Sequence, residues 1–295
     1  MASLTGSLDG EKRTQLKAWF AAQKARRASP VAAETLSFPL AAADVFGTPA
    51  ETTGGALGVD FVEARAPHTL VDVGALPESV AGRPRVKSTL RLAQRMGEGG
   101  IGAVVWNCGR ALAHALPRLP EAAGGAFPAG TAVLELGCGT GLVGLACWLR
   151  GADATLTDLP DISPLAEENA IAVAGVDGAL PPGLAIEPHA WGTPLSPSLE
   201  AAAPYDVVVG SDCLYDAKAL PGLLKTLLAT TDAKSVVYLA YKRRVEEREQ
   251  PFFAELEAAF SDVALTKADA VPEAWRGTGL HVVRLAGKRP TPAAA

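Results

Sequence analysis

The sequence predicts a doubly wound α/β fold with a mostly parallel β-sheet, and three observations support this prediction. From residue 131 onwards, short apolar stretches alternate with longer segments of helical character, which is the order of strands and crossover helices. A glycine-rich turn, Gly137-Cys-Gly-Thr-Gly141, separates the first of these strands from its helix. Residues 205–210 contain three successive valines, which is typical of a strand buried on both faces of a parallel sheet.

The composition describes a chain that can bury a substantial core. Of the 295 residues, 48% are apolar and 20% are charged, and the formal net charge is −5 at pH 7. A negatively charged chain does not neutralise many phosphates, so we do not expect nucleic acid as a partner. No apolar run reaches the length of a membrane span, and the N-terminus lacks the apolar region of a signal peptide. We therefore expect no membrane association, a cytoplasmic location and a monomer.

The cysteines indicate a reducing compartment. There are four of them, Cys108, Cys138, Cys147 and Cys213, and they show neither C-x-x-C spacing nor a histidine at metal-ligand distance in the sequence. Reduced thiols are typical of cytosolic proteins, and the spacing predicts no metal site.

The first 58 residues are expected to form an N-terminal extension made of a helix and a flexible linker. The helix is predicted over 11–27, where Leu16, Trp19 and Phe20 share one face and basic residues surround it. We expect this aromatic face to pack on the main domain. An organelle-targeting segment and a substrate-binding arm are the alternatives, since the region is rich in Ala, Ser and Arg.

A small β region at residues 59–100 is expected to precede the main domain, which we place at 101–288. The β-prone pieces of this region are at 59–62, 69–73 and 86–90, separated by proline and glycine. Residues 101–116 predict a brief strand that continues into a helix ended by Pro117.

Within the main domain, strands and helices are expected to alternate. The strand before the glycine turn is followed by a helix that extends to Leu149. Further strands are expected at 153–157, 184–190, 205–210, 235–240, 263–266 and 280–285. Further helices are expected at 162–174, 218–230 and 252–260, with a proline- and serine-rich loop at 192–204 and a disordered tail at 289–295.

The glycine turn predicts a small-molecule site at the carboxyl end of its strand. Gly137 and Gly139 let the backbone turn sharply and approach a ligand, and Gly144 lets the helix lie close to the strand. The segment also satisfies G-x-G-x-x-G, and Asp158 follows Gly139 by about 20 residues, as in dinucleotide-binding proteins. This pattern alone is a weak signal for a nicotinamide cofactor. Glu135, which precedes the glycines in the pattern E-x-G-x-G-x-G, favours a cofactor other than a nicotinamide dinucleotide.

Polar and aromatic side chains that follow the other strands are expected at the same edge as the glycine turn, because ligands of open α/β sheets bind beyond the carboxyl ends of the strands. These residues are Trp191 after the third strand, Ser211, Asp212 and Tyr215 after the fourth, and Tyr241 after the fifth.

Five motifs occur in a characteristic order along about 160 residues of the main domain. They are Gly102-Ala-Val-Val-Trp106, the segment 134–144 around the glycine turn, Thr157-Asp158, Trp191-Gly192 and Asp212-Cys-Leu-Tyr215. In this order the chain resembles the seven-strand, class I S-adenosylmethionine-dependent protein-lysine methyltransferases of the methyltransferase-like group, whose signature after the fourth strand is D-x-x-Y. The resemblance implies a seven-stranded, mostly parallel sheet and S-adenosyl-L-methionine as the cofactor. It leaves the first hundred residues unassigned.

Carried over residue by residue, the resemblance implies a cofactor pocket. The residues implied to form it are Trp106, Glu135, Gly137, Cys138, Gly139, Asp158, Trp191 and Ser211. Ser211 departs from the alanine that many relatives have at this position. For the two tryptophans, packing in the core is the alternative interpretation.

The resemblance also implies methyl transfer to the ε-amine of a lysine on a partner protein, by in-line displacement. Asp212 is then expected to capture and aim the lysine, with Tyr215 and Tyr241 lining its channel. A loop-fixing carboxylate is the alternative for Asp212, and core packing is the alternative for each tyrosine. A small-molecule N-methyltransferase and a non-catalytic cofactor-binding protein are the rival hypotheses, because a fold does not fix a substrate.

Overall fold

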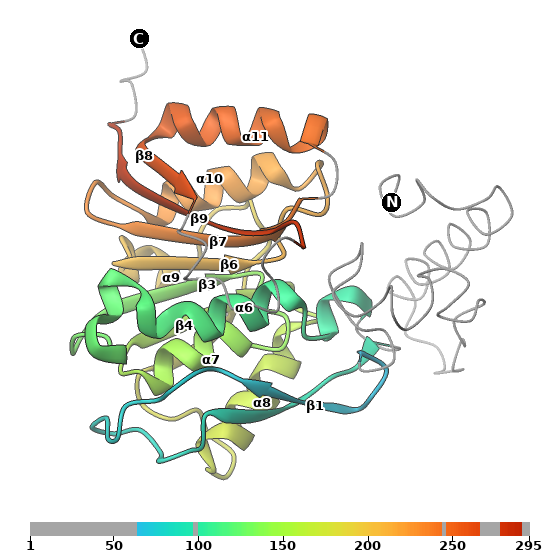
Figure 1. Ribbon diagram of the computed structural model, residues 1–295, viewed down its shortest axis with the longest axis vertical. Helices are drawn as coiled ribbons and strands as arrows, with labels where there is room; N and C mark the ends of the chain where they lie inside the picture. Colours follow the sequence, from blue (N-terminus) through green and yellow to red (C-terminus); the bar gives the residue numbers. More distant parts are fainter. Residues whose placement is uncertain (1–63, 97–99, 244–245, 266–277, 291–295) are drawn as a thin grey trace, which may run out of the picture.

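Seven strands form one mixed sheet at the centre of the protein (Figure 1). The computed structural model describes residues 64–96, 100–243, 246–265 and 278–290. The strands lie in the order β5-β4-β3-β6-β7-β9-β8. The pairs among β5, β4, β3, β6 and β7 are parallel, whereas β9 pairs antiparallel with both β7 and β8. The seven-stranded, mostly parallel sheet expected from the sequence is thereby confirmed.

The elements alternate along the chain as a doubly wound fold requires. The strands of the main sheet are β3 (Ala132–Leu136), β4 (Asp153–Asp158), β5 (Leu184–Pro188), β6 (Val207–Ser211), β7 (Val236–Lys242), β8 (Phe260–Leu265) and β9 (Leu280–Lys288). The helices are α6 (Asn107–Ala115), α7 (Leu142–Leu149), α8 (Ser163–Ala174), α9 (Pro197–Ala202), α10 (Leu220–Thr230) and α11 (Glu246–Ala259). Three short 3-10 helices precede β3, namely η1 (Gly100–Ala103), η2 (Leu116–Arg118) and η3 (Pro120–Gly125).

Helices cover both faces of the sheet, and each face has its own apolar core (Figure 1). Strand β7 shows the division, because successive side chains of a strand point to opposite faces. Tyr238 and Ala240 belong to the core that also contains residues of α6, α7 and α8. Leu239 and Tyr241 belong to the core that also contains residues of α9, α10 and α11. In the described part of the chain, no helix is long and apolar enough to cross a membrane.

A two-stranded hairpin, β1 (His68–Asp72) and β2 (Thr89–Ala93), packs on the α6–α7–α8 side. The alternating pattern is preserved, since Val71 and Leu92 are buried while Leu70 is 63% exposed. Arg110 of α6 donates to the backbone oxygen of Leu70 at 3.2 Å and to Oγ1 of Thr69 at 2.8 Å. The hairpin lies within the residues predicted as a small β region, and its core is continuous with that of the main domain.

Two sequence predictions were wrong. Residues 101–106 form no strand: η1 occupies 100–103, and Val104 and Val105 are buried without pairing in a sheet. Their apolar character therefore reflects burial alone. The predicted loop at 192–204 contains α9, which Ser196 begins by accepting a hydrogen bond from the backbone N–H of Leu199 at 3.2 Å.

Other differences concern element bounds. β2 begins three residues later than the predicted piece at 86–90, and α11 begins six residues before the predicted 252. The predicted helix 11–27, its linker, the strand 59–62 and residues 291–295 of the tail lie outside the described residues.

The segment between β1 and β2 is fixed to the main domain by Arg83. Its guanidinium and Nε donate to the backbone oxygens of Trp148 at 2.9 Å, Pro182 at 2.8 Å and Ala152 at 2.9 Å. The guanidinium carbon also lies 5.0 Å from the ring centroid of Trp148, a distance that permits a cation–π interaction. One side chain thus joins this segment to the end of α7 and to the loops before β4 and β5.

Replacement of Arg83 by alanine should lower the free energy of unfolding by about 2 to 3 kcal/mol, because three carbonyl groups lose their donor and the ring loses its cation. Urea denaturation measures the change. Arg85→Ala is the matched control, since Arg85 is exposed in the same segment, and it should stay within about 0.5 kcal/mol of the wild type. Equal effects of the two substitutions would contradict the role assigned to Arg83.

Candidate active site at the carboxyl edge of the sheet

The glycine turn between β3 and α7 is closely surrounded by other segments. Gly137 and Gly139 have positive φ angles of 68° and 56°, which side chains other than glycine rarely adopt. A Cβ added to Gly137 would lie 2.8 Å from Cζ2 of Trp191 and 3.1 Å from Sγ of Cys213. A Cβ added to Gly139 would lie 2.8 Å from the backbone oxygen of Gly102. The turn therefore meets the segments that precede α6, follow β5 and follow β6.

Glu135 and Gly144 hold α7 close to the strand before it. Oε2 of Glu135 accepts a hydrogen bond from the backbone N–H of Gly144 at 2.7 Å. A Cβ on Gly144 would lie only 2.5 Å from Cγ of Leu156 and 2.7 Å from that same Oε2. Burial raises the pKa of Glu135 to about 8, although the hydrogen bond from Gly144 opposes the shift; the nearby Asp158 carboxylate adds to it. Glu135 thus lies beneath the turn and holds its backbone in place. Its contact with the cofactor stays a prediction.

Asp158 ends β4 directly beside the turn. Its Oδ2 accepts from the backbone N–H of Gly139 and its Oδ1 from that of Leu159, both at 2.7 Å. Burial raises the pKa of Asp158, while the two backbone hydrogen bonds lower it. Each carboxylate oxygen has a second lone pair, so the group retains acceptor capacity for hydroxyl groups of a ligand.

The two tryptophans predicted to form pocket walls lie in different segments, Trp106 before α6 and Trp191 after β5. Trp106 precedes α6, is partly exposed, and donates from Nε1 to the backbone oxygen of Ile101 at 2.8 Å. Trp191 lies over Gly137. Its position follows from a close backbone contact, because a Cβ on Gly222 of α10 would lie 2.8 Å from the Trp191 oxygen. In addition, the N–H of Gly192, the residue after Trp191, donates to Oγ1 of Thr226 at 2.9 Å.

The segment after β6 contains the predicted substrate residues. Asp212 is the one non-glycine residue with a positive φ, 54°, among the described residues, and its N–H donates to the oxygen of Ala240 at 2.8 Å. Such a conformation is strained for most side chains and is frequent at functional sites. Sγ of the next residue, Cys213, lies 3.2 Å from the backbone oxygen of Leu136, which places this segment at the end of β3.

Tyr215 and Tyr241 have different surroundings. Tyr215 is 46% exposed at the edge of the site, and its pKa is raised to about 12 by partial burial and by nearby groups that include Asp158 and Asp216. Tyr241 is 2% exposed and packs against Phe253 and His281, with ring centroids 5.1 and 5.5 Å away. The geometry favours core packing for Tyr241, the alternative considered above.

The remaining predicted residues lie around the turn. The N–H of Cys138 donates to the oxygen of Thr157 at 2.9 Å, which ties the turn to β4. Oγ of Ser211 lies 3.2 Å from the position of a Cβ on Gly109, so α6 passes close to the end of β6 here. Sequence reasoning missed Asn169, which donates to the backbone oxygen of Thr140 in the turn at 3.0 Å. A polar residue on the buried face of α8 was the available signal.

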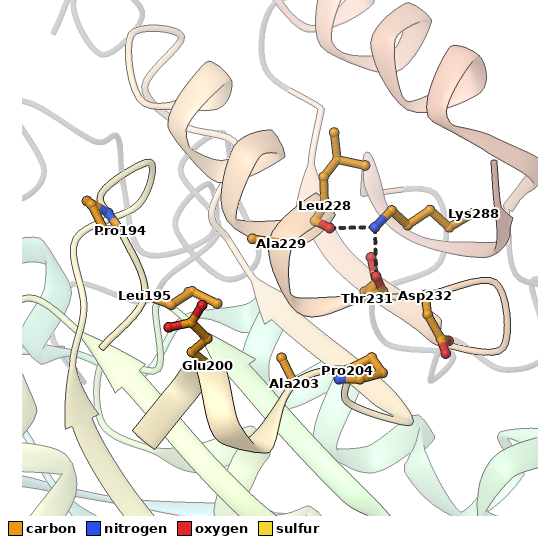
Figure 2. Close-up of a pocket in the computed structure, with 10 residues that line it drawn as sticks. All are labelled: Pro194, Leu195, Glu200, Ala203, Pro204, Leu228, Ala229, Thr231, Asp232 and Lys288. Atoms are coloured by element: carbon orange, nitrogen blue, oxygen red, sulfur yellow. Dashed lines mark hydrogen bonds between the residues drawn. The ribbon is translucent and has the colours of Figure 1, made fainter. Parts of the chain in front are cut away.

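A separate cavity lies at the opposite edge of the sheet (Figure 2). It has a volume of about 570 Å³, and Pro204, Asp232 and Lys288 in its wall flank the start of β6, the start of β7 and the end of antiparallel β9. Nζ of Lys288 donates to the backbone oxygens of Leu228 and Thr231 at 2.5 and 2.7 Å. This cavity is not the predicted site, since ligands of this type of sheet bind at the carboxyl ends of the parallel strands.

The site residues fit S-adenosylmethionine. Gly137 and Gly139 of the turn are partly exposed, Asp158 has acceptor capacity beside them, and Trp106 and Trp191 provide aromatic surfaces. Among the described residues, no group of three or more His, Cys, Asp or Glu is placed to hold a metal ion. The strand order and the turn after β3 are typical of the fold of class I S-adenosylmethionine-dependent methyltransferases.

Comparison with known proteins gives the particular family. The family model described as lysine methyltransferase matches residues 85–259, and the chain belongs to this family. It is therefore an S-adenosylmethionine-dependent protein-lysine methyltransferase, as the sequence motifs predicted.

Curated relatives agree with this assignment. The chain is 32% identical over 198 residues to protein N-lysine methyltransferase METTL21A of Danio rerio, covering 66% of this chain and 84% of that protein. It is 35% identical over 131 residues to EEF1A lysine methyltransferase 3 of Mus musculus, covering 43% and 52%. It is 32% identical over 197 residues to protein-lysine N-methyltransferase EFM6 of Saccharomyces cerevisiae, covering 60% and 78%.

The raised pKa of Glu135 predicts a pH dependence of stability. The folded state keeps this proton up to about pH 8, whereas the group has an ordinary pKa of 4.5 in the unfolded chain. Between these values the folded state binds more protons, so the free energy of unfolding falls as pH rises, by up to about 1.4 kcal/mol per pH unit. Glu135→Gln should remove this slope. Urea denaturation of both proteins at pH 5, 6, 7 and 8 measures it, and parallel pH profiles would contradict the assignment.

Replacement of Asp158 by alanine should weaken binding of S-adenosylmethionine by about 1 to 3 kcal/mol, because charge-assisted hydrogen bonds to the ligand are lost. Titration calorimetry measures the dissociation constant. Asp161→Ala is the control, since Asp161 is an exposed carboxylate in the same segment and should leave the constant unchanged. An unchanged constant for Asp158→Ala would show that the cofactor binds elsewhere or without this carboxylate.

Proposed function

We propose that this chain methylates a lysine ε-amine on a partner protein of the EEF1A type, with Asp212 and Tyr215 receiving the lysine. The observation that supports the placement is the left-handed backbone conformation of Asp212 beside the glycine turn. The relative named EEF1A lysine methyltransferase 3, which shares 35% identity over 131 residues, supports the substrate type. The four cysteines are buried and form no disulfide, which supports a reducing compartment such as the cytoplasm.

The lysine must lose its proton and have a free lone pair before it reacts. When bound, S-adenosylmethionine supplies an electrophilic methyl group on a positively charged sulfur. Gly137, Gly139 and Asp158 would hold the cofactor so that the lysine nitrogen could displace its sulfur in line; the bonding pair would stay on sulfur, and the methylated nitrogen would release a proton to water. With a reference pKa of about 10.4, deprotonating a lysine at pH 7 costs roughly 4 to 5 kcal/mol. A dry channel and a nearby positive charge lower this cost.

Asp212 acts in capture and alignment. A carboxylate favours the charged form of an amine, so Asp212 would raise the pKa of the incoming lysine and would not generate the nucleophile. Asp212 follows β6 directly and is 7% exposed, with a positive φ of 54°. Tyr215, partly exposed in this segment, offers an aromatic face to an ammonium or methylammonium group. The raised pKa of Tyr215 keeps its hydroxyl neutral at physiological pH.

The substrate proposal is tested with purified EEF1A and with a cell lysate, each incubated with this chain and radiolabelled S-adenosylmethionine. We expect label on EEF1A, and mass spectrometry should locate it on a lysine. Label on other lysate proteins alone would reject an EEF1A-type substrate but would still agree with protein-lysine methyltransferase activity. Label in the low-molecular-weight fraction alone would favour a small-molecule substrate.

Replacement of Asp212 by asparagine should abolish turnover, with a loss of about a hundredfold or more, and leave cofactor binding within about twofold. Asparagine is chosen because it tolerates a positive φ angle, whereas alanine would add backbone strain. Initial rates and titration calorimetry measure the two effects. Asp216→Asn is the matched control, because Oδ1 of Asp216 accepts from the N–H of Lys218 and asparagine keeps this acceptor. Full activity of Asp212→Asn would leave Asp212 with a loop-fixing role only.

A further inference from the structure

A buried amide on α8 contacts the glycine turn and the hairpin at once. Asn169 is 1% exposed and lies on the face of α8 that also buries Leu165, Ala166 and Ala170. An amide buried among apolar groups costs free energy unless it is hydrogen-bonded. Its presence on this face therefore requires an explanation from its partners.

The Asn169 side chain forms hydrogen bonds to the backbone of two other segments. Oδ1 accepts from the N–H of Ala93 at 2.7 Å, and Nδ2 donates to the oxygen of Ala93 at 3.2 Å and to the oxygen of Thr140 at 3.0 Å. Ala93 is the last residue of β2, and Thr140 lies between Gly139 and Gly141 in the turn. The amide therefore occupies the place of a neighbouring strand at the edge of β2 and simultaneously fixes one peptide of the turn.

The residues after Ala93 contact the other side of the turn. Oε1 of Gln94 accepts from the N–H of Val105 at 2.8 Å, and the N–H of Arg95 donates to the oxygen of Ala103 at 2.9 Å. The adjacent Gly102 is the residue whose oxygen restricts Gly139. Hydrogen bonds and close contacts thus form a closed path from α8 through the turn, η1 and the end of β2, back to α8.

We propose that Asn169 is a positioning residue for S-adenosylmethionine, which acts by fixing the Thr140 peptide of the glycine turn to the end of β2. The inference rests on the cofactor site used in the proposed function. The turn is held from one side by the carboxylate of Asp158 on the N–H of Gly139 and from the other by the amide of Asn169 on the oxygen of Thr140. Because glycine residues have wide backbone freedom, the turn between Gly137 and Gly141 needs such outside bonds to keep one conformation before the cofactor binds.

The test compares Asn169→Ala with Arg110→Ala in the full chain. Arg110 also joins the hairpin to the main domain, but it does so through Leu70 and Thr69 of β1, not through Ala93 of β2. Calorimetry gives the dissociation constant of S-adenosylmethionine. Hydrogen exchange of the backbone amides at 139–142, measured without cofactor, gives the opening of the turn, and thermal melting gives stability.

We expect Asn169→Ala to weaken cofactor binding and to speed exchange at 139–142 by about tenfold each, the factor that corresponds to the loss of one hydrogen bond. Arg110→Ala should change both by less than about twofold, even where it lowers the melting temperature. If Asn169→Ala fails to fold, Asn169→Ser replaces it, because a hydroxyl has one donor hydrogen and cannot serve both carbonyl groups.

A lower melting temperature for Asn169→Ala with unchanged exchange and unchanged affinity would overturn the proposal and make Asn169 a packing residue. Equal effects of the two variants would also overturn it, because docking of the hairpin would then be the cause. Failure of the wild-type chain to bind S-adenosylmethionine would instead defeat the proposed function. In that case faster exchange at 139–142 would still support the fixing of the turn, and its absence would reject it.

Discussion

The hydrogen bond between Glu135 and the backbone of Gly144 determines the geometry on which the site depends. It holds the first turn of α7 so close to β3 and β4 that no side chain fits at position 144. The glycine turn must then connect strand and helix over a very short span, which requires positive φ angles at Gly137, Gly139 and Gly141. With the turn in this place, Gly102, Trp191 and Cys213 can approach it from three other segments.

Several carboxyl groups lie at or beneath one edge of the sheet, and their environments differ. Glu135 is fully buried and has a raised pKa, whereas Asp158 accepts two backbone hydrogen bonds at the end of β4. Asp212 lies farther along, after β6. Two cations meet in lysine methylation, a sulfonium and an amine that arrives protonated. Negative charge at this edge stabilises both the sulfonium and the ammonium before the reaction. Glu135 is buried and protonated, so it holds α7 in place without adding charge.

The sequence identified the features that depend on local pattern. The strand–turn–helix around Gly137, the alternation of strands and helices along the chain and Asp158 at the end of β4 followed from apolar runs and glycine spacing. Val104 and Val105 misled the prediction because an apolar pair indicates burial and does not specify pairing. Tyr241 occupies the expected strand end, but the face to which its side chain points is set by packing against α11. Asn169 could not be assigned, since its partners are 29 and 76 residues away.

The four cysteines have a practical consequence for spectroscopy. All of them are buried, and burial raises the pKa of Cys138, Cys147 and Cys213. Alkylating reagents attack thiolates that they can reach, so the native thiols of the folded protein are protected from maleimide chemistry. A cysteine introduced at exposed Leu70 would accordingly accept a single fluorophore or spin label on the hairpin, without prior removal of the natural cysteines.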